Sequence, residues 1–331
     1  MVDERALTRE LFVTLRGRRP QPKFSQQLGY TSNVATSWEN GRRQPEVTAL
    51  LRAALVSGID LRPRLIEFFQ SGPAELAKCQ LSSPRTTQLL VEHLVGGHAK
   101  RDLASQLGVN RSTIARWCSG ATDPKVPEFL RLVAICTQRL LDFVNIFCAP
   151  ATLDSTRAAY RALSAQRRVA YDAPFSHAVL RALELDGYRD LPEHSSAWLG
   201  ERLGLGAEEV DQQLKALEAA GQIRFEGQRW LPASLLTVDT REDPERDRTL
   251  KVHWAETALQ RMRDGTLAED GLFSYNLFAI SDEQYEEIRQ LHLEYYHRVR
   301  ALVDAARSAD RVVVVNLQLV PLQPARTEKS S

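Results

Sequence analysis

Two stretches of the chain place polar side chains at the start of a short helix, where they can form hydrogen bonds with the edges of DNA base pairs. Hydroxyl, amide and guanidinium groups are typical of such contacts in the major groove. The candidates are Ser32, Asn33, Thr36 and Ser37 in the first stretch, and Asn110, Arg111, Ser112, Thr113 and Arg116 in the second. We expect Asn33 to suit adenine and the two arginines to suit guanine. The open alternative is that these arginines contact only phosphates.

Both stretches belong to a sequence pattern that occurs twice. Residues 24–45 read FSQQLGYTSNVATSWENGRRQP, and residues 103–124 read LASQLGVNRSTIARWCSGATDP. Five landmarks recur at a constant offset of 79 residues: Leu28 and Leu107, Gly29 and Gly108, Trp38 and Trp117, Gly41 and Gly120, and Pro45 and Pro124. Each copy predicts a helix, a tight turn at Leu-Gly, a second helix with a core Trp, and a left-handed Gly after it. This is the order of a helix-turn-helix, whose second helix enters the major groove.

Apolar spacing and helix breakers predict the other helices of the N-terminal half. The first copy contains helices over 4–16, 23–28, 32–40, 47–55 and 61–69. The second contains helices over 85–95, 100–106 and 111–118, and then a long apolar helix over 129–147. Because this long helix is apolar on most faces, we expect it to lie between domains.

Residues 175–231 predict a third unit with the element order of a winged helix. Helices over 176–185, 195–202 and 207–220 precede two strands, 222–225 and 228–231, which are joined at Glu226-Gly227. The last of these helices carries four acidic residues against one lysine: Glu208, Glu209, Asp211 and Glu218 against Lys215. Phosphates would repel that helix, so we expect this unit to pack against protein rather than to read DNA.

The C-terminal region predicts a small α/β unit after an exposed charged linker, 239–249. Helices over 250–263 and 282–308 alternate with strands over 273–280 and 311–320, which can pair in one sheet. Ser281 and Gln284 predict a capping box for the long helix. The aromatic residues Phe273, Phe278, Tyr285, Tyr295 and Tyr296 are more typical of a core than of a ligand cage. The polar tail, 323–331, is predicted to be disordered.

The net charge of +1 is the sum of two halves of opposite sign. Residues 1–125 contain 18 Lys and Arg against 11 Asp and Glu, whereas the remainder contains 25 against 31. A basic half attracts the phosphate backbone of nucleic acids. The flanking candidates for phosphate contact in the first copy are Arg16, Arg18, Arg19, Lys23, Arg42 and Arg43. The alternative is an ordinary solvated surface, because the excess of positive charge is moderate.

Composition and motifs disfavour several other classes of protein. No apolar run approaches the roughly 20 residues of a membrane helix, and the charged start MVDERALTREL does not resemble a signal peptide. The four cysteines lack CxxC spacing and predict free thiols in a reducing cytoplasm: Cys79, Cys118, Cys136 and Cys148.

The sequence does not predict an enzyme. It contains no GxGxxG, Walker-type, GxSxG or HExxH motif. His292 and His297 are five residues apart on one helix, so they face different directions and do not share a metal easily. His253-Trp254 can line a pocket, although a core position explains the pair equally well. We expect no metal and no cofactor.

The motifs QQLGYTSNVATSWENGRRQP and SQLGVNRSTIARWCSGATDP resemble the Cro/repressor-like (Xre-type) helix-turn-helix regulators of bacteria. The resemblance implies phosphate contacts by Gln21 and Lys100, at the start of the helix before the turn. Arg101, next to Lys100, is a further candidate for phosphate contact. The segment SADRVVVVNLQLVPL is similar to the end of a domain of uncharacterised function that bacterial regulators join to a helix-turn-helix. This second resemblance covers roughly 170–322 and implies a transcriptional regulator without implying a ligand.

The fold class expected from these features is mostly α, with tandem five-helix Cro/repressor-like units followed by a winged-helix-like unit and a small α/β unit. We place the domains at 1–72, 80–148, 170–233 and 250–322. A chain of 331 residues is long enough for this organisation.

The expected function is sequence-specific binding of double-stranded DNA by a cytoplasmic transcriptional regulator. A homodimer formed through the acidic C-terminal half would favour a palindromic site. Two alternatives stay open at this point. The helix-turn-helix modules can serve as a protein-interaction scaffold, or the C-terminal half can hold a small-molecule or peptide effector that gates a repressor.

Overall fold

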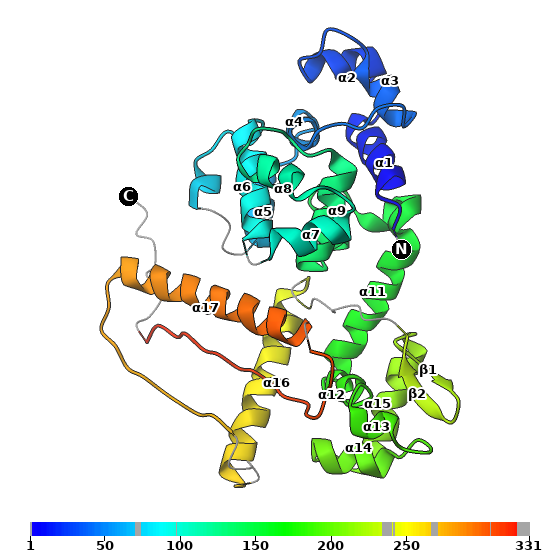
Figure 1. Ribbon diagram of the computed structural model, residues 1–331, viewed down its shortest axis with the longest axis vertical. Helices are drawn as coiled ribbons and strands as arrows, with labels where there is room; N and C mark the ends of the chain where they lie inside the picture. Colours follow the sequence, from blue (N-terminus) through cyan, green and yellow to red (C-terminus); the bar gives the residue numbers. More distant parts are fainter. Residues whose placement is uncertain are drawn as a thin grey trace.

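The chain folds mostly into α-helices, with one small antiparallel sheet in the part that is described (Figure 1). A computed structural model describes residues 2–69, 74–96, 98–233, 240, 242–265, 271–304 and 306–322. The first predicted domain boundary, part of the predicted linker and the predicted tail 323–331 lie outside the described residues. Within them, no helix is both long enough and apolar enough to cross a membrane.

The described part of the N-terminal half contains ten α-helices, five in each sequence copy. The first five are α1 (Glu4–Arg16), α2 (Gln21–Gln27), α3 (Val34–Glu39), α4 (Val47–Val56) and α5 (Leu61–Phe69). The short helix η1 (Ala74–Ala77) follows, and the second five are α6 (Pro84–Val95), α7 (Lys100–Leu107), α8 (Arg111–Cys118), α9 (Val126–Thr137) and α10 (Leu140–Asn145). The offset of 79 residues therefore extends beyond the landmarks to the starts of α2 and α7, α4 and α9, and α5 and α10.

The long apolar helix predicted over 129–147 is wrong, because the structure divides it into α9 and α10. Gln138 separates the two helices in a left-handed conformation, with φ of 55°. The change of direction brings Phe143 of α10 back against Phe129 of α9 and Phe68 of α5. The segment is apolar on most faces because α9 contacts helices of both copies.

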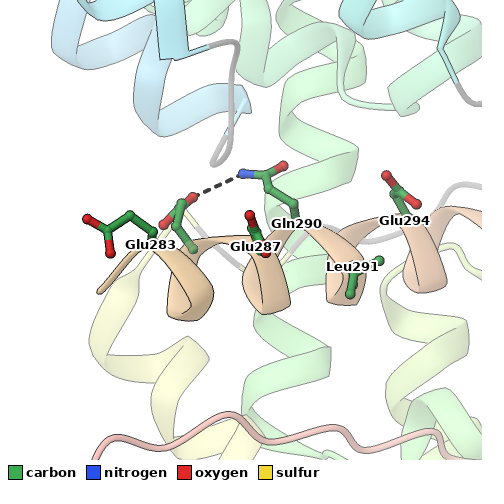
Figure 2. Close-up of a pocket in the computed structure, with 6 residues that line it drawn as sticks. Glu283, Glu287, Gln290, Leu291 and Glu294 are labelled. Carbon is green, nitrogen blue, oxygen red and sulfur yellow. Dashed lines mark hydrogen bonds between the residues drawn. The ribbon is translucent and has the colours of Figure 1, made fainter. Parts of the chain in front are cut away.

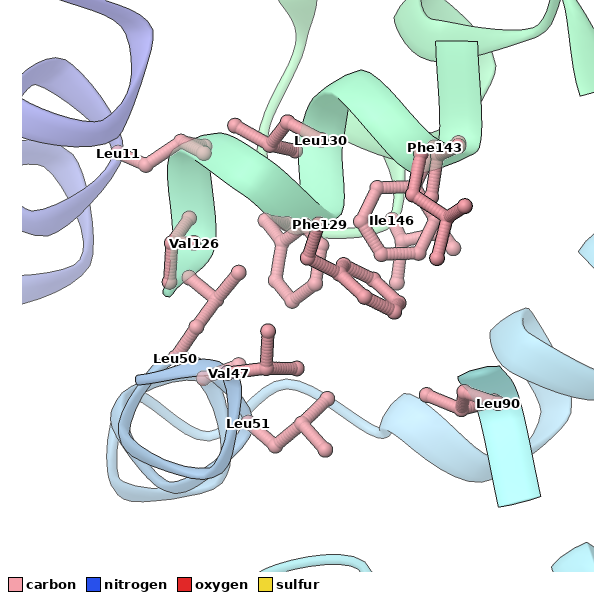
Figure 3. Close-up of a cluster of buried hydrophobic side chains, with 14 of the residues drawn as sticks. Leu11, Val47, Leu50, Leu51, Leu90, Val126, Phe129, Leu130, Phe143 and Ile146 are labelled. Atoms are coloured by element: carbon pink, nitrogen blue, oxygen red, sulfur yellow. The ribbon is translucent and has the colours of Figure 1, made fainter. Parts of the chain in front are cut away.

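The two copies share one continuous hydrophobic core that extends from Leu7 to Leu153. Figure 3 shows side chains from α1, α4, α6, α9 and α10 meeting in this core. Several of them occupy equivalent positions in the two copies: Leu11 and Leu90, Val47 and Val126, Leu50 and Phe129, and Leu51 and Leu130. Trp38 and Trp117 are buried, as predicted for core anchors. The proposed boundary between the first two domains stays a prediction.

Glycines at the two turns of each copy adopt backbone conformations that other residues rarely adopt. Gly29 and Gly108 have φ of 84° and 69°, and Gly41 and Gly120 both have φ of 70°. These values confirm the left-handed turns predicted from the repeated pattern.

A helix that the sequence did not predict joins the N-terminal half to the rest of the chain (Figure 1). The short helix η2 (Pro150–Thr152) leads into α11 (Asp154–Asp172), whose first turn is held by Glu10, which accepts hydrogen bonds from the amide and hydroxyl of Ser155. Three of the four buried residues of α11, Thr156, Gln166 and Arg167, are polar. Periodicity of apolar residues could not reveal this helix, because the face that it buries is largely polar.

The third unit contains the predicted helices followed by a β-hairpin. Its elements are α12 (Ser176–Ala182), α13 (Asp186–Arg189), α14 (Ser196–Leu203), α15 (Ala207–Ala219), β1 (Ile223–Glu226) and β2 (Arg229–Pro232). Glu226 pairs with Arg229, so the turn residues are Gly227 and Gln228 rather than Glu226-Gly227. Both turn residues have positive φ, as a type I′ turn requires. A second hydrophobic core lies within this unit, between Val179 and Ile223.

The C-terminal region differs from the predicted α/β unit. It contains α16 (Pro244–Arg263) and α17 (Asp282–Asp304), and no strand forms in 271–281 or 306–322. The strands predicted over 273–280 and 311–320 are therefore wrong for this chain. In Figure 1 both segments run as extended chain below α17, and neither is paired with another strand of the described residues.

Two smaller expectations for this region are corrected and one is confirmed. Residues 244–249 of the predicted linker are helical, because Asp243 caps α16 and Pro244 occupies its first turn. The aromatic group predicted as a core is largely exposed: Phe273, Phe278, Tyr295 and Tyr296 are exposed and Tyr285 is half-buried. The capping box is confirmed, since Ser281 and Gln284 exchange hydrogen bonds between side chain and backbone.

We predict that Gly108→Ala destabilises the chain by about 1 kcal/mol, because Ala is strained at this φ. A methyl group at Gly108 would meet no atom within 4 Å, so a steric clash does not contribute. Gly108→Asn is the matched control, since Asn tolerates the left-handed region better. Urea unfolding of the three proteins measures the difference, and equal stability of the Ala variant and the parent would contradict the strain.

Candidate nucleic-acid interface

Helix α8 presents a polar face to solvent and an apolar face to the core. Ile114 and Trp117 are buried, which orients the opposite side of the helix outward. The five candidates of the second copy lie on that outer side or at the helix start: Asn110, Arg111, Ser112 and Arg116 are exposed, and Thr113 is half-buried. The structure therefore brings these residues together on one short helix.

The outer face of α8 has no partners within the described chain. None of its five candidate side chains forms a hydrogen bond or ion pair with a described residue, and Asn110 does not cap the helix through its side chain. Lys100 and Arg101 at the start of α7 are also exposed and unpaired with respect to the described residues. Two cations on α7 and two on α8 are thus available to an external ligand.

Helix α3 differs because several of its polar groups already have internal partners. Asn33 caps the helix, since its Oδ1 accepts from the amide of Thr36 at 3.5 Å. The hydroxyl of Thr36 donates to Oε1 of Gln21 at 2.7 Å, and Nε2 of Gln21 donates to Oε2 of Glu39 at 2.7 Å. Ser32 remains exposed and Ser37 half-buried. The two copies therefore share a fold but differ in the number of polar groups they leave free.

Glu39 and Arg16 complete this hydrogen-bond network, which the sequence did not predict. Nε and Nη2 of Arg16 donate to the two carboxylate oxygens of Glu39, at 2.6 and 3.1 Å, and thereby tie α1 to α3. The guanidinium of Arg19 also donates hydrogen bonds, to the carbonyl of Val56 and to the hydroxyl of Ser57. Arg16 and Arg19 therefore hold the fold, which corrects their interpretation as free phosphate ligands.

The other candidates for phosphate contact in the first copy remain accessible. Arg18, Lys23, Arg42 and Arg43 are exposed, and their side chains have no partner within the described residues. Lys23 lies on α2, which precedes α3, and Arg42 and Arg43 lie in the turn after α3. The cations of this copy thus surround α3 rather than lying on it.

Helix α15 of the third unit exposes the acidic residues that the sequence indicated. Glu208, Glu209, Asp211 and Glu218 lie on its outer side, while Val210, Leu214 and Leu217 are buried. A phosphate backbone would meet like charge on this helix. The expectation that this unit packs against protein stays a prediction.

The hollows of the described surface offer little enclosure for a small ligand. Figure 2 shows one of them, whose labelled lining residues all lie on α17 and include Glu283, Glu287 and Glu294. A surface formed by one helix cannot surround a ligand, as binding pockets usually do. A second hollow, of about 300 Å³, is lined in part by Asp142 and Glu242, which already pair with Arg167.

The cysteines show no sign of nucleophilic chemistry. All four are free, as predicted. Burial raises the pKa of Cys136 to about 12, and burial with the nearby Glu10 raises the pKa of Cys148 to about 11. A thiol with such a pKa stays protonated at neutral pH and is a poor nucleophile. Within the described residues, no cluster of three or more potential ligands could hold a metal.

A serine and a histidine do meet in the third unit, but their hydrogen bonds run in the wrong direction for a nucleophile. Nε2 of His194 lies 2.8 Å from Oγ of Ser196, and that hydroxyl donates to Asp211. Since the serine proton is directed to the carboxylate, His194 donates to the serine instead of acting as its base. Nδ1 of His194 then accepts from the buried hydroxyl of Tyr188, at 3.0 Å. The chain of bonds joins α13 to α14 and α15.

His253 and Trp254 belong to a packed aromatic group. Their rings lie 5.1 and 5.5 Å from the ring of Phe175, at angles typical of edge-to-face contact. Both residues are half-buried and pack on Phe175 outside the two hydrophobic cores, so the choice between a pocket and a core position stays open.

Comparison with known proteins places the C-terminal half in a family. A family model described as a domain of unknown function, DUF4423, matches residues 155–322. The chain belongs to this family. No curated protein matches the chain, and no solved structure matches it. The match begins with α11, earlier than residue 170, where the sequence analysis placed the start of this region.

We predict that acid weakens the third unit through His177 on α12. Burial, with a smaller effect of Arg181, lowers the pKa of His177 to about 4, so the folded state keeps the ring neutral. Below the ordinary pKa near 6.5 the unfolded chain binds a proton that the folded chain does not, so stability falls as the pH falls. Between pH 7 and 5 the loss should be about 2 kcal/mol.

Urea unfolding of the parent and of His177→Gln at both pH values measures this loss. The variant cannot titrate at this position and should lose less stability in acid than the parent. If the stability of His177→Gln depended on pH as strongly as that of the parent, other groups would be the cause of the loss in acid.

Proposed function

We propose that this protein is a transcriptional regulator that binds double-stranded DNA in a sequence-specific manner, through two Cro/repressor-like helix-turn-helix units. The observation that carries the proposal is the outer face of α8, where Arg111 and Arg116 are exposed and have no partner among the described residues. A guanidinium can donate to both O6 and N7 of one guanine, which makes arginine the commonest reader of that base. The element order of each copy fits insertion of its third helix into a major groove.

The second copy is the stronger candidate for base recognition. Lys100 and Arg101 on α7 can hold the phosphates while Arg111, Ser112 and Arg116 on α8 reach the bases. No hydrogen bond or ion pair with a described residue has to break for these contacts to form. Among the described residues, binding therefore costs these polar groups no intramolecular partner.

The first copy is suited to positioning on the DNA backbone. Asn33, Thr36 and Gln21 are committed in part to the network around Glu39, so a bidentate contact of Asn33 with adenine would compete with the helix cap. Ser32 and Ser37 remain as readers, and Lys23, Arg42 and Arg43 can contact phosphates. The phosphate contacts fix register, and base selection by this copy falls to Ser32 and Ser37.

We also propose that the protein forms a homodimer through its C-terminal half. The segments 271–280 and 311–322 expose many large apolar side chains, among them Leu272, Tyr275, Leu277 and Val313. Both segments have β-branched or aromatic residues typical of strands, and an extended apolar backbone tends to pair with another edge. A second copy of the chain offers the same segments and can cover them.

We predict that the purified protein loses affinity for random duplex DNA steeply as salt rises. If six or more phosphates are contacted, affinity should fall about 10³-fold or more between 50 and 200 mM salt. Arg111→Ala and Arg116→Ala should each cost about 1–3 kcal/mol on the selected site, and less on random sequence. Fluorescence anisotropy with labelled duplexes measures both effects.

The exposed Arg161 on α11 supplies a matched control, because Arg161→Ala removes the same charge away from α8. Its affinity should equal that of the parent. Weak binding that hardly changes with salt would refute DNA binding and favour the scaffold. Equal losses on all sequences in the two α8 variants would refute base recognition by these arginines.

We predict a dimer at micromolar concentration in light scattering. Leu277→Glu with Val313→Glu places charge on both exposed segments and should shift the protein to monomer without lowering its stability, because both side chains are exposed. If the parent protein is monomeric at this concentration, the proposed homodimer is contradicted.

A further inference from the structure

The two sequence copies are paired inside one chain by contacts that are reciprocal. The amide of Val47 donates to the carbonyl of Pro124 at 3.1 Å, and the amide of Val126 donates to the carbonyl of Pro45 at 2.9 Å. Positions 45 and 124, and positions 47 and 126, are equivalent under the offset of 79. A contact in which each partner uses the same surface is the mark of a two-fold axis.

The first and fourth helices and the core repeat this relation. The fifth helices also contact each other in both directions, although at positions that are not equivalent: Arg64 donates to the carbonyl of Ile146 after α10, and Arg139 donates to the carbonyl of Phe68 near the end of α5. Helix α1 packs on α9 while α6 packs on α4, so each first helix contacts the fourth helix of the other copy. Figure 3 shows both members of several equivalent pairs, such as Val47 and Val126, in this one core.

Charge at the axis makes the pairing specific for two different copies. Glu46 and Lys125 are equivalent positions that face each other in an antiparallel bridge, with Nζ of Lys125 3.0 Å from Oε1 of Glu46. Two first copies from separate chains would place Glu46 against Glu46, and two second copies would place Lys125 against Lys125. Like charges at a contact disfavour both arrangements, so the pair within the chain is favoured over either exchange.

A two-fold relation between the copies determines how they meet DNA. Helices α3 and α8 precede the paired segments by the same number of residues, since Glu39 and Cys118 end these helices seven residues before Glu46 and Lys125. Two third helices related by a two-fold axis read half-sites in inverted order, because the symmetry of the protein is mirrored in its site. A head-to-tail arrangement would read a direct repeat instead.

The residues that face the DNA are not equivalent, although the helices are. Ser32 corresponds to Arg111 and Ser37 corresponds to Arg116. A serine and an arginine do not select the same base. Symmetry in the core is thus combined with asymmetry on the outer faces.

We propose that one chain acts as its own dimer and reads a single DNA site composed of two inverted but unequal half-sites, one for α3 and one for α8. This proposal rests on the proposed function and specifies its DNA substrate. The centres of the half-sites lie about one turn of B-DNA apart, roughly 34 Å. Copies from two chains are not needed to complete the site.

Selection from a duplex library with a randomised central segment, using the full chain, tests this inference. The parent should enrich a motif with two different halves in inverted order. Arg116→Ala should lose base preference by about tenfold in one half only. Ser32→Arg combined with Ser37→Arg gives α3 two arginines at the positions of those on α8, and should make the two halves more alike.

The outcomes separate this inference from the function on which it rests. If no motif is enriched and binding does not depend on salt, DNA binding itself fails. If a motif is enriched but forms a direct repeat, a single half-site or two equal inverted half-sites one turn apart, the proposed DNA binding stands and the pairing of the two copies on one site is overturned. Loss of preference in both halves on Arg116→Ala would likewise overturn it, because it would require α8 at each half-site. Circular dichroism of each variant establishes that it is folded.

Discussion

The relative placement of the two sequence copies depends on two backbone hydrogen bonds between the segments at Pro45–Val47 and Pro124–Val126. Backbone groups buried between packed helices need partners, and these segments supply them to each other. The bond pair also fixes the starts of α4 and α9, whose apolar residues form the shared core. Because α3 and α8 each lead into one of these segments, the same contact determines where their outer faces point.

The inside and the outside of the paired copies follow different constraints. In the core, equivalent positions remain apolar even where size differs, as with Leu50 and Phe129. On the surface, equivalent positions differ in charge: Ser32 against Arg111, and Glu46 against Lys125. A core needs only volume and apolar character, whereas a bound partner or a contact across an axis depends on charge and hydrogen-bonding groups. The two copies could therefore diverge outside while keeping one packing arrangement inside.

Particular residues show why part of this structure could be predicted and part could not. Gly29, Gly108 and the two tryptophans gave the helices and turns of each copy, because left-handed turns and large core anchors leave local signals. The network of Gln21, Thr36 and Glu39 depends on side chains that meet only in the folded unit, so the spacing of these residues along the sequence does not predict it. Helix α11 was not predicted for a related reason, because most of the residues that it buries are polar. The strands predicted over 273–280 and 311–320 had strand-like residues but no neighbouring edge, and a strand exists only as part of a pair.

The junction between the paired copies and the C-terminal family domain is itself an electrostatic constraint. Arg167 on α11 is buried, and its guanidinium donates to Asp142 of α10 at 2.5 Å and to Glu242 at 2.6 Å. Burial alone would lower the pKa of Arg167, but the two carboxylates raise it, so the charge persists in the interior. If α11 moved away from α10, Arg167 would lose Asp142 and keep Glu242. The ion pair of Arg167 with Asp142 thus joins the family domain to α10, a helix that also takes part in the contact between the two copies.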